Sequence, residues 1–282
     1  MNLSTKSKIA AAGVLSKGIR MGRNFFGLDN DAVFKRNNIR WQLDLAQGID
    51  FAIFLQGGFE PSTIRSYKNH VGRGSVVLDI GANIGAHTLP LASLVGDTGK
   101  VIAFEPTDYA FTKLMKNLEL NPELSVRTIP VQAMLAANPG QAKPDSIPSS
   151  WSLEREAHRD VHPVHGGTFQ ALKRAIVLKL DDWYQLNPLE RLDFVKIDVD
   201  GYEIDVLEGG VNLFSIHSPV IMMEFAPYLF EERGRSFSEL LQMLKDLDYQ
   251  CRMISGSEVL LDSSLLRHIP KGGSINVILR KR

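Results

Sequence analysis

Short apolar runs alternate with amphipathic segments through most of the chain. The runs lie at 76–80, 100–104, 126–131, 175–183, 192–198, 218–225, 249–254 and 274–282. Apolar runs that stop abruptly at polar or turn-forming residues are typical of buried strands in a parallel sheet. Segments between them, such as 107–121 and 236–249, carry apolar residues at helical spacing. This alternation predicts an α/β fold, a doubly wound sheet with right-handed crossovers.

Residues 1–57 do not follow this alternation. Residues 1–28 are basic, contain no acid and favour a helical or frayed extension. Residues 29–53 predict strands, a turn near Gly48 and a short helix. A further short helix begins near Pro61, for which Ser62 or Thr63 is the expected cap. We therefore predict an extension and lid at 1–57 and one main domain at 58–282.

Composition and charge limit the kinds of partner that we expect the protein to bind. The chain of 282 residues contains 32 basic and 32 acidic residues, so net charge gives no reason to expect a nucleic-acid partner. Cys251 is the only cysteine, so an internal disulfide is excluded, and a reducing, cytoplasmic location is the expectation. The sequence contains no run of about eighteen apolar residues, which is the length needed to cross a bilayer. The basic N-terminal helix lying on an anionic membrane is an alternative to a solvated extension.

The sequence VVLDIGANIG at 76–85 predicts a tight turn directly after a strand. Gly81 and Gly85 can adopt backbone angles that other residues avoid and leave room for a ligand. Asn83 stands where a third glycine is usual, and asparagine tolerates a left-handed conformation. Asp79 precedes the turn and Ala82 lies within it. We expect this turn to bind part of a nucleoside cofactor.

A second strand ends in FEP, which places Glu105 about twenty residues beyond the turn. A carboxylate at this spacing can accept hydrogen bonds from both ribose hydroxyls. Asp79 on the turn would repel a pyrophosphate, whereas a cationic sulfonium nucleoside such as S-adenosyl-L-methionine (SAM) fits that charge. A nicotinamide-dependent oxidoreductase and a catalytically silent nucleoside-binding protein are the alternatives.

Other cofactor-binding candidates follow from position. Gln132 and Ala133 follow the third strand, at the edge of the sheet where ligands bind, and would flank an adenine. Pro106, beside Glu105, and Glu60, ahead of the first strand, complete the set.

A second group of acids follows the strand at 192–198. Asp200 and Glu203 lie at the start of a helix, where capping explains acidic residues. Capping does not explain Asp198, which directly follows a buried strand and Lys196 and is therefore expected to face the cleft. Glu224 ends the next strand.

Residues 138–171 predict a long irregular insert that contains three histidines. His158 and His162 are spaced to share a helix face, which raises metal binding as one alternative. A base or orienting role for one histidine, with His165 as the candidate, is another. Trp151 would either form the wall of a sugar site or anchor the loop.

Five segments, VVLDIGANIGAHTL, VIAFEP, NLELN, FVKIDVDGYEIDVLEGG and PVIMMEF, resemble the FkbM family of SAM-dependent O-methyltransferases over residues 58–224. The resemblance implies a Rossmann-like, class I methyltransferase sheet of seven strands whose final strand is antiparallel. It also implies methylation of hydroxyls on sugars of glycolipids or polysaccharides, or on secondary metabolites. Asp200, where the family often has glutamate, and the insert depart from the family pattern.

Carried onto this chain, the resemblance implies that Asp79, Gly81, Asn83 and Gly85 surround the methionine part of SAM. Glu105 would bind the ribose, and Asp198 would face the reacting centre. The expected reaction is an in-line attack by an acceptor oxygen on the sulfonium methyl group, with alignment as the largest contribution. The base candidates, in order, are Asp198, Glu224 and His165. A divalent metal held by Asp198 and other acids is an alternative that the sequence does not favour.

Overall fold

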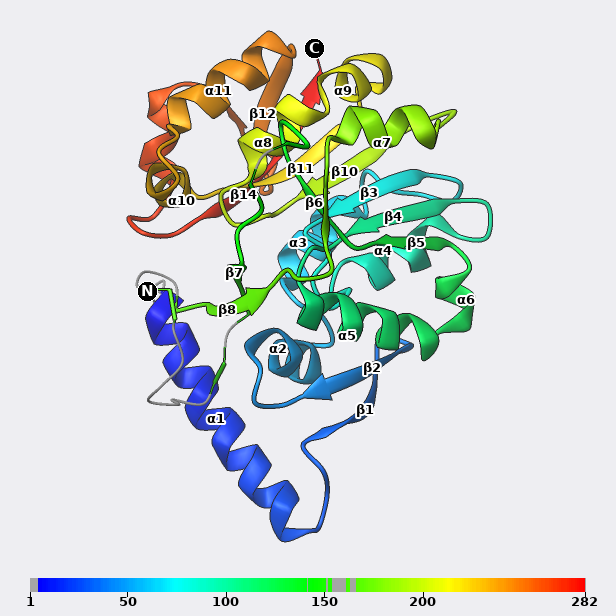
Figure 1. Ribbon diagram of the computed structural model, residues 1–282. Coiled ribbons are helices and arrows are strands. Elements are labelled where there is room, and N and C mark those ends of the chain that lie inside the picture. Colours follow the sequence, from blue (N-terminus) through cyan, green and yellow to red (C-terminus); the bar gives the residue numbers. More distant parts are fainter. Residues whose placement is uncertain (1–4, 141, 151, 154–160, 163–165, 282) are drawn as a thin grey trace.

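A sheet of eight strands forms the centre of the molecule (Figure 1), in the order β13-β12-β14-β11-β10-β3-β4-β5. The computed structural model describes residues 5–140, 142–150, 152–153, 161–162 and 166–281. The strands are β3 (Val76–Ile80), β4 (Lys100–Phe104), β5 (Thr128–Val131), β10 (Phe194–Ile197), β11 (Val220–Phe225), β12 (Tyr249–Met253), β13 (Glu258–Val259) and β14 (Ile275–Lys281).

The strand directions confirm the Rossmann-like, doubly wound sheet. β3 pairs in parallel with β4 and β10, and β10 pairs in parallel with β11. The final strand, β14, runs antiparallel to both β11 and β12, as expected. The expected number of seven strands is corrected to eight, because the two-residue β13 pairs with the outer edge of β12. The strand order reverses between β3 and β10, and ligands bind at such a switch point.

Helices cover both faces of the sheet (Figure 1). One face packs against α4 (Thr88–Val95) and α5 (Asp108–Glu119), with α6 (Pro122–Ser125) following α5. The other face packs against α7 (Leu180–Leu186), α8 (Glu203–Gly209), α9 (Val211–His217), α10 (Pro227–Glu232) and α11 (Phe237–Asp246). A short 3₁₀ helix, η1 (Ser263–His268), precedes β14.

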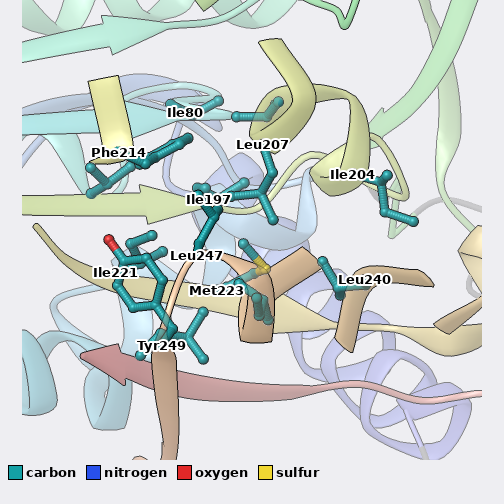
Figure 2. Close-up of a cluster of buried hydrophobic side chains, with 14 of the residues drawn as sticks. Ile80, Ile197, Ile204, Leu207, Phe214, Ile221, Met223, Leu240, Leu247 and Tyr249 are labelled. Atoms are coloured by element: carbon teal, nitrogen blue, oxygen red, sulfur yellow. The ribbon is translucent and has the colours of Figure 1, made fainter. Parts of the chain in front are cut away.

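Alternating side chains along the strands build two separate cores. In β3, Leu78 belongs to the cluster beneath α8 and α9, whereas Val77 belongs to the cluster beneath α4. Figure 2 shows the first cluster, in which Ile197 and Met223 of neighbouring strands lie close to Leu207. These side chains are almost fully buried, and apolar burial of this kind contributes about 25 cal/mol per Å².

The N-terminal extension packs on the α4–α5 face. It consists of α1 (Thr5–Phe25), β1 (Asp31–Arg36), β2 (Ile39–Asp44) and α2 (Gly48–Gln56), and α3 (Pro61–Tyr67) follows it. The expected strands, turn and short helix are confirmed. Asn117 of α5 and Asn121, which precedes α6, fix β2, because their side-chain oxygens accept the backbone N–H groups of Gln42 and Arg40 at 2.8 and 2.9 Å.

The expected cap of α3 is wrong. The capping position is occupied by Glu60 in a left-handed conformation, and Pro61 is the first helical residue. Proline fits there because it lacks the N–H that would otherwise need a partner. In the part of the chain that the structure describes, no helix is long and apolar enough to cross a membrane.

The insert is more regular than the sequence predicts. β7 (Ser146–Ser150) and β8 (Thr168–Ala171) form an antiparallel pair. The strand expected at 175–183 is also corrected: only β9 (Ile176–Leu178) is extended, and it pairs with β6 (Ala133–Leu135) outside the main sheet. The two acids that follow begin α7, where Asp181 accepts backbone N–H groups from the start of α9.

Candidate active site

The glycine turn lies at the carboxyl edge of the sheet, pressed against the end of β10. Gly81 has a φ of +85°, and a Cβ there would lie 1.8 Å from the carbonyl oxygen of Asp198. The main chain of Asp198 therefore fills the space that a Gly81 side chain would need, and Gly81 also lines the two cavities described below. Asn83 has a φ of +49°, which confirms the left-handed conformation expected from its side chain.

Glu105 is tied to this turn. Its Oε2 accepts the backbone N–H of Asn83 at 2.9 Å, and its Oε1 accepts the backbone N–H of Thr107 at 2.8 Å and the Thr107 hydroxyl. Its side chain is 3% exposed, and burial raises the pKa of Glu105 despite these hydrogen bonds. A carboxylate has about four acceptor sites, so Oε2 keeps one for a ligand.

Asp79 lies behind the turn. It is fully buried, and its Oδ2 accepts a hydrogen bond from the Thr88 hydroxyl at 2.6 Å, while its Oδ1 has no hydrogen-bond partner in the part of the chain that the structure describes. Burial raises the pKa of Asp79, and the Lys196 charge opposes that shift. Asp79 and Gly85 lie outside the lining of the two cavities described below. In the structure, Asp79 and Gly85 support the turn from outside the cavities.

Two cavities open at this edge. The apolar cavity runs from the turn past β4, β6 and α8, and its wall includes Glu105, Pro106 and Ala133 among the sequence candidates. Its remaining lining is largely hydrophobic: Ile80, Phe104, Met134, Leu135, Ile147, Val199, Tyr202 and Val206. Gln132 lies outside this lining and instead donates its side-chain N–H to Asp108 at 2.9 Å.

The acidic cavity adjoins it. Its charged lining consists of Glu60, Lys196, Asp198, Asp200 and Glu224. Ala82 lies in the same wall, and Ile49 and Phe59 bring in the N-terminal part of the chain. The two cavities share Gly81, Asn83, Ser149, Asp198 and Asp200. Ser149 of β7 accepts the side-chain N–H of Asn83 at 2.7 Å through its carbonyl oxygen, so the insert forms part of both cavities.

Lys196 and Asp198 form an ion pair at the junction of the cavities. Lys196 Nζ lies 2.9 Å from Asp198 Oδ2, and the side chains are 2% and 27% exposed. Burial opposes both charges, yet the Lys196 ammonium holds the pKa of Asp198 below its usual value. Asp198 and Asp79 in turn hold the pKa of Lys196 above its usual value despite burial. Asp198 is therefore ionised at neutral pH.

The pKa values of the neighbouring acids shift in the opposite direction, upward. Burial and then the charge of Asp198 raise the pKa of both Glu224 and Asp200 well above the usual range. Glu224 also accepts the Ser274 hydroxyl at 2.5 Å. Burial raises the pKa of Glu60. Its carboxylate accepts hydrogen bonds from the Thr63 hydroxyl at 2.9 Å and from the side-chain N–H of Asn276 at 3.0 Å. Of the two leading base candidates, Asp198 thus has a lowered pKa and Glu224 a raised one.

Asp200 does not cap α8. The capping position is Tyr202 and lacks a side-chain hydrogen bond, which corrects the explanation of Asp200 by capping. Glu203 instead reaches back and accepts the backbone N–H of Val199 at 3.1 Å. Asp200 adopts a left-handed φ of +49° in the wall of both cavities.

His87 is a site residue that the sequence did not single out. Its ring is 4% exposed, lines the acidic cavity, and finds no hydrogen-bond partner for either nitrogen among the described residues. Burial, followed by the Lys196 charge, lowers the pKa of His87 to about 3, so the ring is neutral. Lys196 is a second site residue that was not among the sequence candidates, although a lysine inside the apolar run FVKI is a signal that the sequence contains.

The remaining sequence candidates fall in or near the insert. Trp151, His158 and His165 lie outside the described residues. His162 Nε2 lies 2.7 Å from Glu232 Oε2. Within the described ranges, no group of three or more histidine, cysteine or acidic side chains is arranged to hold a metal ion.

The doubly wound sheet, its antiparallel final strand and the glycine turn at its switch point define a Rossmann-like methyltransferase. The family model described as the methyltransferase FkbM domain matches residues 79–251, and the chain belongs to this family. This assignment supports methyl transfer over the nicotinamide-dependent alternative and implies the use of SAM.

Known proteins show more distant similarity. The hexuronic acid methyltransferase AglP of Haloferax volcanii is 24% identical over 198 residues, which cover 67% of this chain and 75% of that protein. The FkbM methyltransferase structure from Methylobacillus flagellatus is 18% identical, with a TM-score of 0.44, and the match covers 73% of this chain and 43% of that one. SMU.1697c of Streptococcus mutans, solved in complex with SAH, is 11% identical, with a TM-score of 0.43 and coverage of 78% and 96%.

Proposed function

We propose that the protein transfers a methyl group from SAM to a hydroxyl group of a sugar. The observation that carries this proposal is the meeting of an apolar and an acidic cavity at Asp198. The apolar cavity, with Glu105 in its wall, suits an adenosine. The acidic cavity suits a positively charged sulfur, because carboxylates stabilise a nearby cation.

The residues present fit the cofactor. Glu105 keeps an acceptor site for a ribose hydroxyl, Pro106 and Ala133 lie in the wall for the adenine, and Asn83 lies where the cavities join. SAM, when bound, supplies a methyl group made electrophilic by the positive sulfur. Gln132 is dropped from the adenine contacts, because its side chain is bonded to Asp108.

The acceptor would bind in the acidic cavity. A sugar hydroxyl adds no charge there, whereas an acceptor carboxylate would face Glu60, Asp198, Asp200 and Glu224 with Lys196 as the only cation of the described lining. This charge distribution favours a hydroxyl as the reacting group. AglP acts on a hexuronic acid, which makes sugars the first acceptor class to test.

Asp198 is the proposed base. It is ionised and held in place by Lys196, so it can accept a hydrogen bond from the acceptor hydroxyl and then its proton. Glu224 is the weaker candidate, because burial and then the charge of Asp198 raise its pKa. Its hydrogen bond to Asp198 instead positions that carboxylate. We assign no role to His165.

The experiment is incubation of the protein with methyl-labelled SAM and a panel of neutral sugars and hexuronic acids. Mass spectrometry detects the methylated product, and mild alkali distinguishes its linkage, because a methyl ether survives and a methyl ester is cleaved. We expect an alkali-stable product. An alkali-labile product would place the methyl group on a carboxylate and overturn the hydroxyl assignment, and SAM binding without transfer to any sugar would overturn the acceptor class.

A further inference from the structure

One exposed face of α1 carries no charged residue. Positions 11, 14, 15, 18, 21, 22 and 25 lie on one face of the helix, because they follow the i, i+3, i+4, i+7 spacing. They are occupied by Ala11, Val14, Leu15, Gly18, Met21, Gly22 and Phe25, and all seven are exposed. The opposite face is the one that packs on the protein: Ser16 is fully buried and donates to the Leu45 carbonyl oxygen at 2.6 Å.

This face continues into the turn after the helix. Phe26 is 76% exposed and packs edge-to-face on Phe25, with ring centroids 5.3 Å apart. Six of the 20 large apolar side chains that the structure shows exposed lie between Val14 and Leu28. We call residues 11–28 on this side the α1 face. Contiguous exposed apolar surface of this kind marks an interaction site.

The distribution of charge along the chain indicates what kind of surface the α1 face would bind. Residues 1–28 contain five basic residues and no acid, whereas the 32 acids and the other 27 basic residues follow. The N-terminal segment is therefore strongly positive and the rest of the chain negative. An anionic surface would attract α1 and repel the remainder, which also fixes the orientation of binding.

We propose that the α1 face binds the surface of a membrane containing anionic phospholipid. A helix with an apolar face, a basic flank and no acid lies in the plane of the headgroups with its apolar side chains inserted. Phe25, Phe26 and Met21 supply the inserted groups. Lys17 is exposed beside the face and supplies charge to the headgroups.

The α1 helix is also joined to the cavity wall. A Cβ at Gly13 would lie 3.4 Å from the carbonyl oxygen of Leu153, and Leu153 follows β7, whose Ser149 lines both cavities. Figure 1 shows the start of α1 close to β7 and β8. Membrane binding through α1 would thus place the insert side of the site near the lipid headgroups. The binding itself does not depend on the identity of the acceptor.

Vesicle sedimentation of the full chain tests the proposal. We expect at least tenfold tighter binding to vesicles of phosphatidylcholine containing a quarter phosphatidylglycerol than to phosphatidylcholine alone, and weaker binding at high salt. The double variant Met21→Ser/Phe25→Ser should lose at least tenfold in affinity. The matched control is Leu186→Ser/Ile216→Ser, which removes two apolar side chains of comparable exposure from α7 and α9 and should bind as the unchanged chain does.

Three results would overturn the proposal. The first is that the unchanged chain stays in solution with anionic vesicles, and the second is that both double variants bind equally well. The third is that light scattering shows a dimer that only Met21→Ser/Phe25→Ser dissociates, because the α1 face would then be an interface between two copies. Urea unfolding of each variant confirms that the fold is retained.

Discussion

Asp198 combines a low pKa with a position at the junction of two cavities. Because Lys196 keeps it ionised, Asp198→Asn should lower turnover by about 10²–10⁴-fold, the usual contribution of a general base. SAM affinity should change far less. Single-turnover transfer and SAM titration measure the two effects. The control is Asp97→Asn, which alters an ion-paired aspartate that is 70% exposed. Near-normal turnover in Asp198→Asn would remove Asp198 from the reaction.

His87 allows stability and activity to be separated. A buried ring without hydrogen bonds costs about 1–3 kcal/mol, so His87→Phe should leave the protein equally or more stable. If a ligand in the acidic cavity accepts the ring N–H, the same variant should raise the acceptor KM at least tenfold. His87→Asn, which keeps a donor, should recover part of this loss. A variant that is stable and fully active would reduce His87 to a packing residue.

At the scale of single elements, the turn between β3 and α4 depends on the close approach of Gly81 to Asp198. Gly81→Ala should destabilise the protein by more than about 3 kcal/mol, because the added Cβ meets backbone that cannot move aside. Gly27→Ala is the matched control, since Gly27 also has a positive φ but has nothing within 4 Å of its Cβ position. It should cost about 1–2 kcal/mol. Equal losses in urea unfolding would contradict the clash.

The elements that the sequence predicts well are those with an unambiguous local signal. The apolar run of β3 and the left-handed Asn83 both follow from residue types at fixed spacing. The failures involve tertiary contacts. β9 is apolar enough for the main sheet but pairs with β6, and the close approach of Gly81 to the Asp198 backbone joins two distant segments of the chain. No local pattern contains either fact.

The residues of the candidate site also divide into those that the sequence predicts and those that depend on tertiary contacts. Asp198 and Glu105 were identified because acids at the ends of buried strands are conspicuous. His87 was not, because its environment is created by Phe59 and Tyr67 from the segment ahead of β3, whose rings meet it edge-to-face at 6.0 and 5.9 Å. The raised pKa of Glu224 was equally hidden, since it depends on burial and on the charge of Asp198, which follows the neighbouring strand.

At the scale of the whole molecule, the buried acids predict how stability changes with pH. Burial raises the pKa of Glu203 to about 7, and Glu224 and Asp200 lie higher than usual as well. Above pH 6.5 the folded protein therefore holds protons that the unfolded chain has lost. Stability must fall as pH rises, by about 1–2 kcal/mol between pH 6.5 and 8.5. Urea unfolding at the two pH values measures this, and a rise would contradict the assignment.

The same protons link the cofactor to pH. A positive sulfur in the acidic cavity favours ionised carboxylates, so its binding should release protons from acids such as Glu224 and Asp200. Because binding releases protons, SAM affinity should increase as pH rises. We expect on the order of one proton released per SAM near neutral pH. Calorimetry in buffers of different ionisation enthalpy measures the number.

S-adenosylhomocysteine is the control for this release. It carries the same amine, carboxylate and nucleoside but a neutral sulfur, so any difference in proton release belongs to the sulfur charge. We expect a smaller release and a weaker pH dependence than with SAM. If both ligands release the same number of protons, the acids of the cavity do not respond to the sulfur. The acidic lining formed with Glu60 would then have to serve the acceptor instead.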